Sequence, residues 1–241
     1  MLIAGLACDT RSWTPVIDGF SKRFQTIVFD NRGVGRSGMP ESPYGIRDMA
    51  EDTLKLLDHL NLQSTNIIGH SLGGYIAQEF AIRYPGRVNK LILESTAPQS
   101  SARNNLLFQR FLEWRLNGME LEPWIWAWSF WLFPPPRFED RSFIDAHVKA
   151  ALQNPHPHST SAFKGQIEAI LTHNTLARLK KIRAETLVIE GEEDILIPPE
   201  EAGQLAKRIP GCSMSVVEDA GHIVHVEKPE AFIRTALDFL S

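Results

Sequence analysis

The sequence feature that most constrains the fold is a serine between two glycines, placed where an apolar segment meets a helical pattern. Asn66-Ile67-Ile68 runs directly into Gly69-His70-Ser71-Leu72-Gly73, and Ile76 to Ala81 follow in a helical pattern. A G-x-S-x-G motif between a strand and a helix is typical of a nucleophile elbow. Since the bare motif is also found in ordinary strand–helix turns, the flanking strand and helix carry the prediction.

The elbow predicts a specific local geometry around Ser71. The turn is so sharp that the serine adopts a strained, left-handed backbone. Side chains at Gly69 and Gly73 would clash with the neighbouring strand and helix. The Ser71 hydroxyl then lies above the sheet at a helix N-terminus, where the dipole and free N–H groups favour an oxyanion.

Strands and helices alternate on both sides of the elbow. Residues 1–6 are predicted as the end of a strand that runs into a loop. Further strands are predicted at 24–30, 88–93, 185–190 and 213–217, and helices at 46–60, 199–208 and 229–240. Short connections between alternating elements are typical of a parallel sheet covered on both faces. The predicted fold class is therefore α/β, with a mostly parallel sheet flanked by helices.

The alternation stops between residues 98 and 174, where no clear strand is found. This segment holds five of the six tryptophans and reads as a helical cap inserted into a core made of residues 1–97 and 175–241. Trp124, Trp126, Trp128 and Trp131 lie too close together for one helix to bury all of them on one face. We expect Trp124, Trp128 and Trp131 to line a substrate pocket, although a plain core role fits the same pattern equally well.

Composition narrows the functional classes. The net charge of −4 gives no electrostatic case for binding nucleic acid or an anionic membrane. The two cysteines, Cys8 and Cys212, are far apart, which argues against a disulfide framework. No signal peptide is recognised, and no segment reaches the ~20 apolar residues of a membrane span. We expect a cytoplasmic protein that acts on a small molecule.

Two residues late in the chain are candidate partners for Ser71. Asp194 follows one predicted strand and His222 follows the next, and the carboxyl ends of parallel strands meet at one edge of the sheet. A serine hydroxyl needs a base, and the base needs a group that orients it. We therefore predict Ser71, Asp194 and His222 as the catalytic residues, with His225 as a weaker alternative base because Gly221 frees the backbone at His222.

Other polar groups near these positions are assigned lesser roles. Glu190 remains on its strand, and Glu192 and Glu193 are expected to face solvent. The histidines of 154–158 lie between prolines with no acidic cluster nearby, so a solvated loop is favoured over a metal site. We expect no metal and no cofactor.

Taken together, the motifs resemble those of the α/β-hydrolase superfamily. The matching segments are 30–37, 69–74, 191–198, 221–222 and 227–232. Within the superfamily, the chain resembles serine esterases and lactonases such as 3-oxoadipate enol-lactonases. The serine at the elbow speaks against dehalogenases and epoxide hydrolases of this fold, which use an aspartate there.

The resemblance implies an oxyanion hole made by the backbone N–H groups of Leu6 and Leu72. It also shows two departures. Ala4-Gly5 stands where the family usually has His-Gly, and the family's first two strands are absent before Leu2. Segment 24–29 would then form a sheet edge, so we expect either a homodimer that covers it or a natural start upstream.

The resulting hypothesis is hydrolysis of a small carboxylic ester or lactone through an acyl-enzyme on Ser71. Hydrolysis of a carbon–carbon bond or a thioester by the same three residues remains open, because the cap determines the substrate. A member of the fold that binds ligand without turnover is the alternative from another class.

Overall fold

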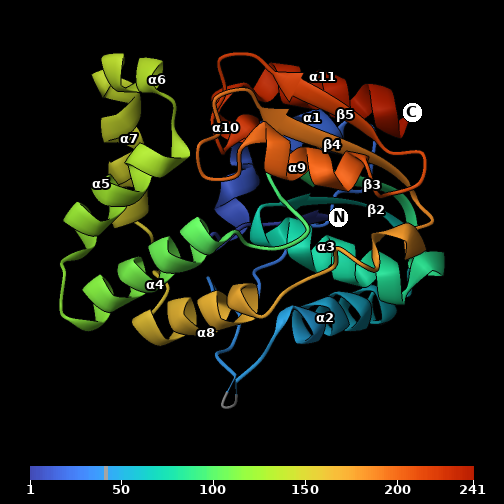
Figure 1. The fold of residues 1–241 in the computed structure, drawn as a ribbon, viewed down its shortest axis with the longest axis horizontal. Helices are drawn as coiled ribbons and strands as arrows, with labels where there is room; N and C mark the ends of the chain where they lie inside the picture. The colour runs from blue at the N-terminus through green and yellow to red at the C-terminus, as the bar shows by residue number, and fades with distance from the viewer. Residues whose placement is uncertain (41–42) are drawn as a thin grey trace.

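The computed structural model describes residues 1–40 and 43–241, which form a parallel sheet with helices on both faces (Figure 1). Its five strands pair in the order β1-β2-β3-β4-β5, all parallel. The strands are β1 (Leu2–Ile3), β2 (Thr65–His70), β3 (Val88–Glu94), β4 (Glu185–Gly191) and β5 (Ser213–Val217). This arrangement confirms the predicted α/β fold.

Helices cover the sheet because successive side chains of each strand point to opposite faces. Ile67, Leu91 and Leu93 belong to one buried cluster, and Ile68 and Ile92 belong to the other. The helices of the core are α1 (Thr14–Ser21), α2 (Ile46–His59), α3 (Leu72–Arg83), α9 (Pro199–Ala206), α10 (Val224–Glu227) and α11 (Pro229–Leu240), with short 3-10 turns η1 (Thr10–Trp13), η2 (Pro85–Arg87) and η3 (Leu179–Lys181).

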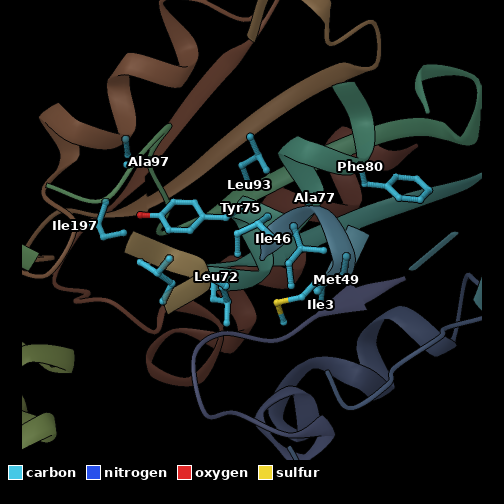
Figure 2. Close-up of a cluster of buried hydrophobic side chains, with 14 of the residues drawn as sticks. Ile3, Ile46, Met49, Leu72, Tyr75, Ala77, Phe80, Leu93, Ala97 and Ile197 are labelled. Carbon is cyan, nitrogen blue, oxygen red and sulfur yellow. The ribbon is translucent and has the colours of Figure 1, made fainter. Parts of the chain in front are cut away.

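The two faces are covered by different helices. Helices α2, α3 and α9 contribute to the first cluster, and α1, α10 and α11 to the second. Figure 1 shows α1 and α11 on one side of the strands and α2 and α3 on the other. Figure 2 shows Ile3, Met49 and Leu72 close together within the first cluster, so α2 and α3 pack against the face of the sheet to which Ile3 of β1 points.

The strand predicted at 24–30 is wrong. Only Val28 makes a bridge, to Leu2, supported by a hydrogen bond from the Leu2 amide to the Ile27 carbonyl. The neighbouring strand β1 has only two residues before the chain turns into the loop at Ala4. Segment 24–30 therefore has no longer strand beside it to pair with. Segment 24–30 still lies at this edge of the sheet, and association of two copies through it stays a prediction.

Helices fill the segment predicted as a cap. They are α4 (Ala102–Leu116), α5 (Leu121–Leu132), α6 (Pro135–Glu139), α7 (Arg141–Leu152) and α8 (Thr160–Leu171). Gln99 and Asn174 form an antiparallel bridge, and the Thr175 amide donates to the Pro98 carbonyl at 2.9 Å. The two ends of the segment are thus fastened together where it leaves the core, and α5, α6 and α7 extend to one side (Figure 1).

In the parts of the chain that the structure describes, every helix is too short or too polar to cross a membrane.

Candidate active site

The turn at Ser71 has the geometry of the predicted elbow. Ser71 has φ 53° and ψ −114°, a strained conformation for a residue with a side chain. A Cβ on Gly69 would collide with the backbone of Gly73, and a Cβ on Gly73 would collide with the carbonyl of Ile3. Glycine is therefore required at both positions, because β2, α3 and β1 approach so closely.

The structure brings Ser71, His222 and Asp194 into one hydrogen-bonded line. His222 Nε2 lies 3.0 Å from Ser71 Oγ, and His222 Nδ1 lies 2.7 Å from Asp194 Oδ2. Because a carboxylate can only accept, Nδ1 carries a proton and donates to Asp194. His222 and Asp194 are buried, so the line is shielded from water on the side of the base.

The loop after β4 fixes Asp194. Its Oδ1 accepts from the amides of Leu196 and Ile197 at 2.8 and 2.9 Å, which leaves Oδ2 for His222. Each carboxylate oxygen of Asp194 therefore has its own donors. Because Oδ2 is fixed in this way, it holds the His222 ring in one orientation.

The cap holds the backbone of His222. The His222 amide donates to the carbonyl of Leu132 at the end of α5, at 2.9 Å. The Gly221 amide donates to the carboxylate of Glu227 at 3.0 Å, and Arg137 of α6 lies 3.6 Å from the same carboxylate. Burial raises the pKa of Glu227 to about 7. The position of His222 thus depends on cap residues as well as on the core.

A second buried polar group lies beneath the line, and the sequence reasoning did not identify it. Glu94, the last residue of β3, accepts from the backbone and the ring of His225 at 3.0 and 2.8 Å. His70 Nε2 lies 3.0 Å from the His222 carbonyl, which can only accept, so this nitrogen carries the proton. Since all three side chains are buried, the cluster ties the segment 222–225 to the ends of β2 and β3.

The electrostatics of this cluster favour a hydrogen-bonded brace. Burial lowers the pKa of His70 to about 3, so this histidine is neutral. The pKa of Glu94 is held below its usual value, because His225 outweighs the opposing effect of burial. Candidate ligand atoms of His70, Glu94 and His225 lie within 4.8 Å of one another, which is the spacing of a loose metal site. The contacts to the His222 carbonyl and to Glu94 already use one nitrogen of each histidine.

Glu190 adds a second buried carboxyl beside Asp194. It lies on β4 and accepts from the Gly191 amide at 3.1 Å. Burial, followed by the nearby charge of Asp194, raises the pKa of Glu190 well above its usual value. Burial therefore favours the protonated form of Glu190. A charged residue inside an apolar strand was the sequence signal for both Glu190 and Glu94.

The predicted oxyanion hole consists of the backbone N–H groups of Leu6 and Leu72. Leu6 and Leu72 both line the cavity at Ser71. Among the described residues, the Leu6 amide donates to no protein acceptor. The Leu72 amide, at the first residue of α3, donates to none outside that helix. The loop with Ala4-Gly5 is steadied by other groups: Asn31 donates to the Ala4 carbonyl at 3.1 Å, and the Ala7 amide donates to Gln166 of α8 at 2.9 Å.

A cavity of about 630 Å³ lies between the core and the cap at Ser71. Trp124 and Trp128 line this cavity, as predicted. Trp131 does not belong to the described residues that line it, so this part of the prediction is wrong. Trp131 instead packs under the guanidinium of Arg103, 5.7 Å from its ring centre. The sequence could not separate these tryptophans, because the packing partners of α5 were unknown. His158, expected in a solvated loop, also lines the cavity.

Comparisons with known proteins agree with this fold. A family model described as "alpha/beta hydrolase fold" matches residues 1–229. A protein of Caulobacter segnis named "Putative carbamate hydrolase RutD" is 28% identical, with 100% of this chain and 90% of that protein covered.

Two solved structures are also similar. The enol-lactonase from Burkholderia xenovorans has a TM-score of 0.90 at 26% identity, covering 99% of this chain and 89% of its own. The thermophilic esterase from Thermogutta terrifontis has a TM-score of 0.87 at 26% identity, covering 99% and 88%. Since the family model spans nearly the whole chain, the protein is a member of the α/β-hydrolase family.

Proposed function

We propose that the protein hydrolyses a carboxylic ester or lactone through an acyl-enzyme formed on Ser71. The observation that carries this proposal is the continuous hydrogen-bonded line from Asp194 through His222 to Ser71. A strained elbow, a base within hydrogen-bond reach of the serine and an oriented carboxylate are the parts that an activated serine needs.

In the proposed mechanism, His222 Nε2 takes the proton of Ser71 as its oxygen attacks the substrate carbonyl. The amides of Leu6 and Leu72 donate to the oxyanion that develops, and each donor of this kind is worth about 3 kcal/mol. His222 then protonates the leaving alkoxide and later activates a water that releases the acyl group. Asp194 stays ionised and stabilises the imidazolium.

The ester or lactone bond is supported by the printed names of two structural neighbours, an enol-lactonase and an esterase. Hydrolysis of a carbamate is the second candidate, because relatives similar over the whole chain carry that name. Both reactions would use the same three residues, so the leaving group distinguishes them.

The test is hydrolysis of p-nitrophenyl esters by the native protein and by Ser71→Ala. Ser64→Ala is the matched control, because Ser64 precedes the same strand that Ser71 follows. We expect Ser71→Ala to fall by about 10⁶-fold and Ser64→Ala to retain the native rate. Retention of most activity in Ser71→Ala would refute the assignment, and matched p-nitrophenyl carbamates would show which bond is cleaved faster.

A further inference from the structure

The cavity at Ser71 is large for the bond that would be cleaved there. At about 630 Å³ it lies in the range of sites that enclose drug-sized ligands. A carbamate or acetate group of a few heavy atoms would leave most of this volume empty. The space therefore fits a substrate with a sizeable group attached to the reacting carbonyl or to its leaving oxygen.

The cap gives this cavity an aromatic wall. Phe108, Trp124, Trp128, Phe143 and Phe163 line it from helices α4, α5, α7 and α8. The indole N–H of Trp124 donates to the Phe111 carbonyl at 3.1 Å, so this ring offers no free polar atom to a ligand. A wall of this composition favours apolar groups, since each buried methylene stabilises binding.

The charges at the cavity neutralise each other. Apart from histidines, Asp9 and Arg11 are the charged side chains among the described residues of the wall. Arg11 Nε lies 3.1 Å from both carboxylate oxygens of Asp9, and Nη2 lies 3.0 Å from Oδ2. Asn154 donates to Asp9 as well, at 3.0 Å. The donors of Arg11 are thus directed to a carboxylate that the protein itself supplies.

Two cap histidines of the wall are neutral at physiological pH. Burial lowers the pKa of His147 and of His158 to about 4. The cap arginines also bind protein groups: Arg103 donates to the Leu196 carbonyl, and Arg137 pairs with Glu227. The wall therefore presents no unpaired cation among these groups to hold a substrate carboxylate.

The paired charges lie close to the entrance. Arg11, Thr14 and Pro15 line the cavity and are exposed to solvent, and so are Ala146 and Ala150 of α7. The cavity consequently opens between the η1–α1 segment and α7. A charged group that enters past this point leaves water for aromatic surroundings, which is unfavourable without a partner.

We propose that the substrate is an uncharged ester or lactone with a medium-sized apolar group, and that the Asp9–Arg11 pair makes the cavity select against substrates carrying a carboxylate. This inference rests on the proposed ester hydrolysis at Ser71. It also favours the ester or lactone over the second candidate, because a free carbamate is a small anion.

The experiment compares p-nitrophenyl hexanoate with the p-nitrophenyl monoester of adipic acid, which has the same six-carbon acyl chain but ends in a carboxylate. We expect kcat/KM for the hexanoate to exceed that for the adipate by about 100-fold, and that for the acetate by about 10-fold. Equal or faster hydrolysis of the adipate would overturn the inference while leaving the Ser71 proposal intact. Background rates with all three esters would overturn the Ser71 proposal itself.

A pair of variants tests the role of the ion pair. Asp9→Asn leaves Arg11 without its carboxylate, so the preference for hexanoate over adipate should fall at least about 10-fold. Adding Arg11→Leu to Asp9→Asn should restore the preference. An unchanged preference in a folded Asp9→Asn protein would contradict the assigned role of the pair. The comparison of hexanoate with adipate in the native protein tests the inference whether or not the variants fold.

Discussion

The hydrogen-bonded line from Asp194 through His222 and the cavity wall meet at Ser71 but depend on different kinds of interaction. In the line, each ring nitrogen of His222 has one partner: Nδ1 faces Asp194, and Nε2 faces Ser71. In the wall, rings pack against one another at centroid distances of 5.0–6.4 Å; they belong to Phe108, Trp124, Trp128 and Phe163. Changes in the line should therefore reduce turnover, whereas changes in the wall should alter which substrate is preferred.

Among the changes that test this contrast, Asp194→Asn is expected to reduce turnover the most. The amide keeps the shape of the carboxylate but favours the wrong tautomer of His222 and leaves the imidazolium unstabilised, so kcat should fall by about 10⁴-fold. The measurement is steady-state hydrolysis of p-nitrophenyl hexanoate. Asp18→Asn on the exposed face of α1 is the control, and equal activity of the two variants would contradict the role of Asp194.

A smaller loss of turnover is expected for Glu94→Gln. Glu94 is not among the described residues that line the cavity, but it holds the ring and backbone of His225 and so positions the segment that carries His222. We expect kcat to fall by about 10- to 100-fold with KM changed less than about 3-fold. A rise in KM without loss of kcat would show that this brace acts on binding instead.

The wall should respond in the opposite way. Trp128→Phe shortens a buried ring that packs against Phe111, which widens the cavity with little loss of contact. The optimal acyl chain should lengthen by about two carbons, and the rate with p-nitrophenyl acetate should change less than about 3-fold. A uniform loss over all chain lengths would mean that Trp128 supports the line rather than the pocket.

The smallest effect on activity is expected for Glu227→Gln, which tests how the cap-linked loop depends on pH. The folded-state pKa of Glu227, about 7, lies above its usual 4.5, so the folded protein binds this proton more tightly than the unfolded chain. Its stabilising contribution is present below pH 4.5 and is lost as pH rises to about 7, by at most about 3 kcal/mol.

Glutamine removes this dependence and keeps an acceptor for the Gly221 amide. Urea unfolding at pH 5 and pH 8 should therefore show a smaller decrease for Glu227→Gln than for the native protein. Glu230→Gln, an exposed change on α11, is the control. Parallel pH dependence in all three proteins would contradict the assigned pKa.

The sequence predicts the hydrogen-bonded line at Ser71 better than it predicts the surroundings of that line and the cavity wall. The elbow motif and the strand alternation predict the sheet and bring Ser71, Asp194 and His222 to one edge, because parallel strands end together. The brace of Glu94 and His225 was missed, since it joins residues 131 positions apart and no motif marks it. The pair Asp9–Asn154 similarly links the core to the cap.

Two further predictions failed for local reasons. The segment 24–30 has strand composition, yet β1 offers it only two residues to pair with. Trp131 shares its sequence context with Trp128, yet packs under Arg103. In both cases, the outcome depends on a neighbour that is distant in sequence and cannot be read from local composition.

The most direct test of the central claim is covalent labelling with a fluorophosphonate, which reacts only with an activated serine. Mass spectrometry of the native protein should show one label, located on the peptide that contains Ser71. His222→Ala should lose the label, while His59→Ala on the exposed end of α2 should keep it. A native protein that takes no label, or a label on another serine, would contradict the account.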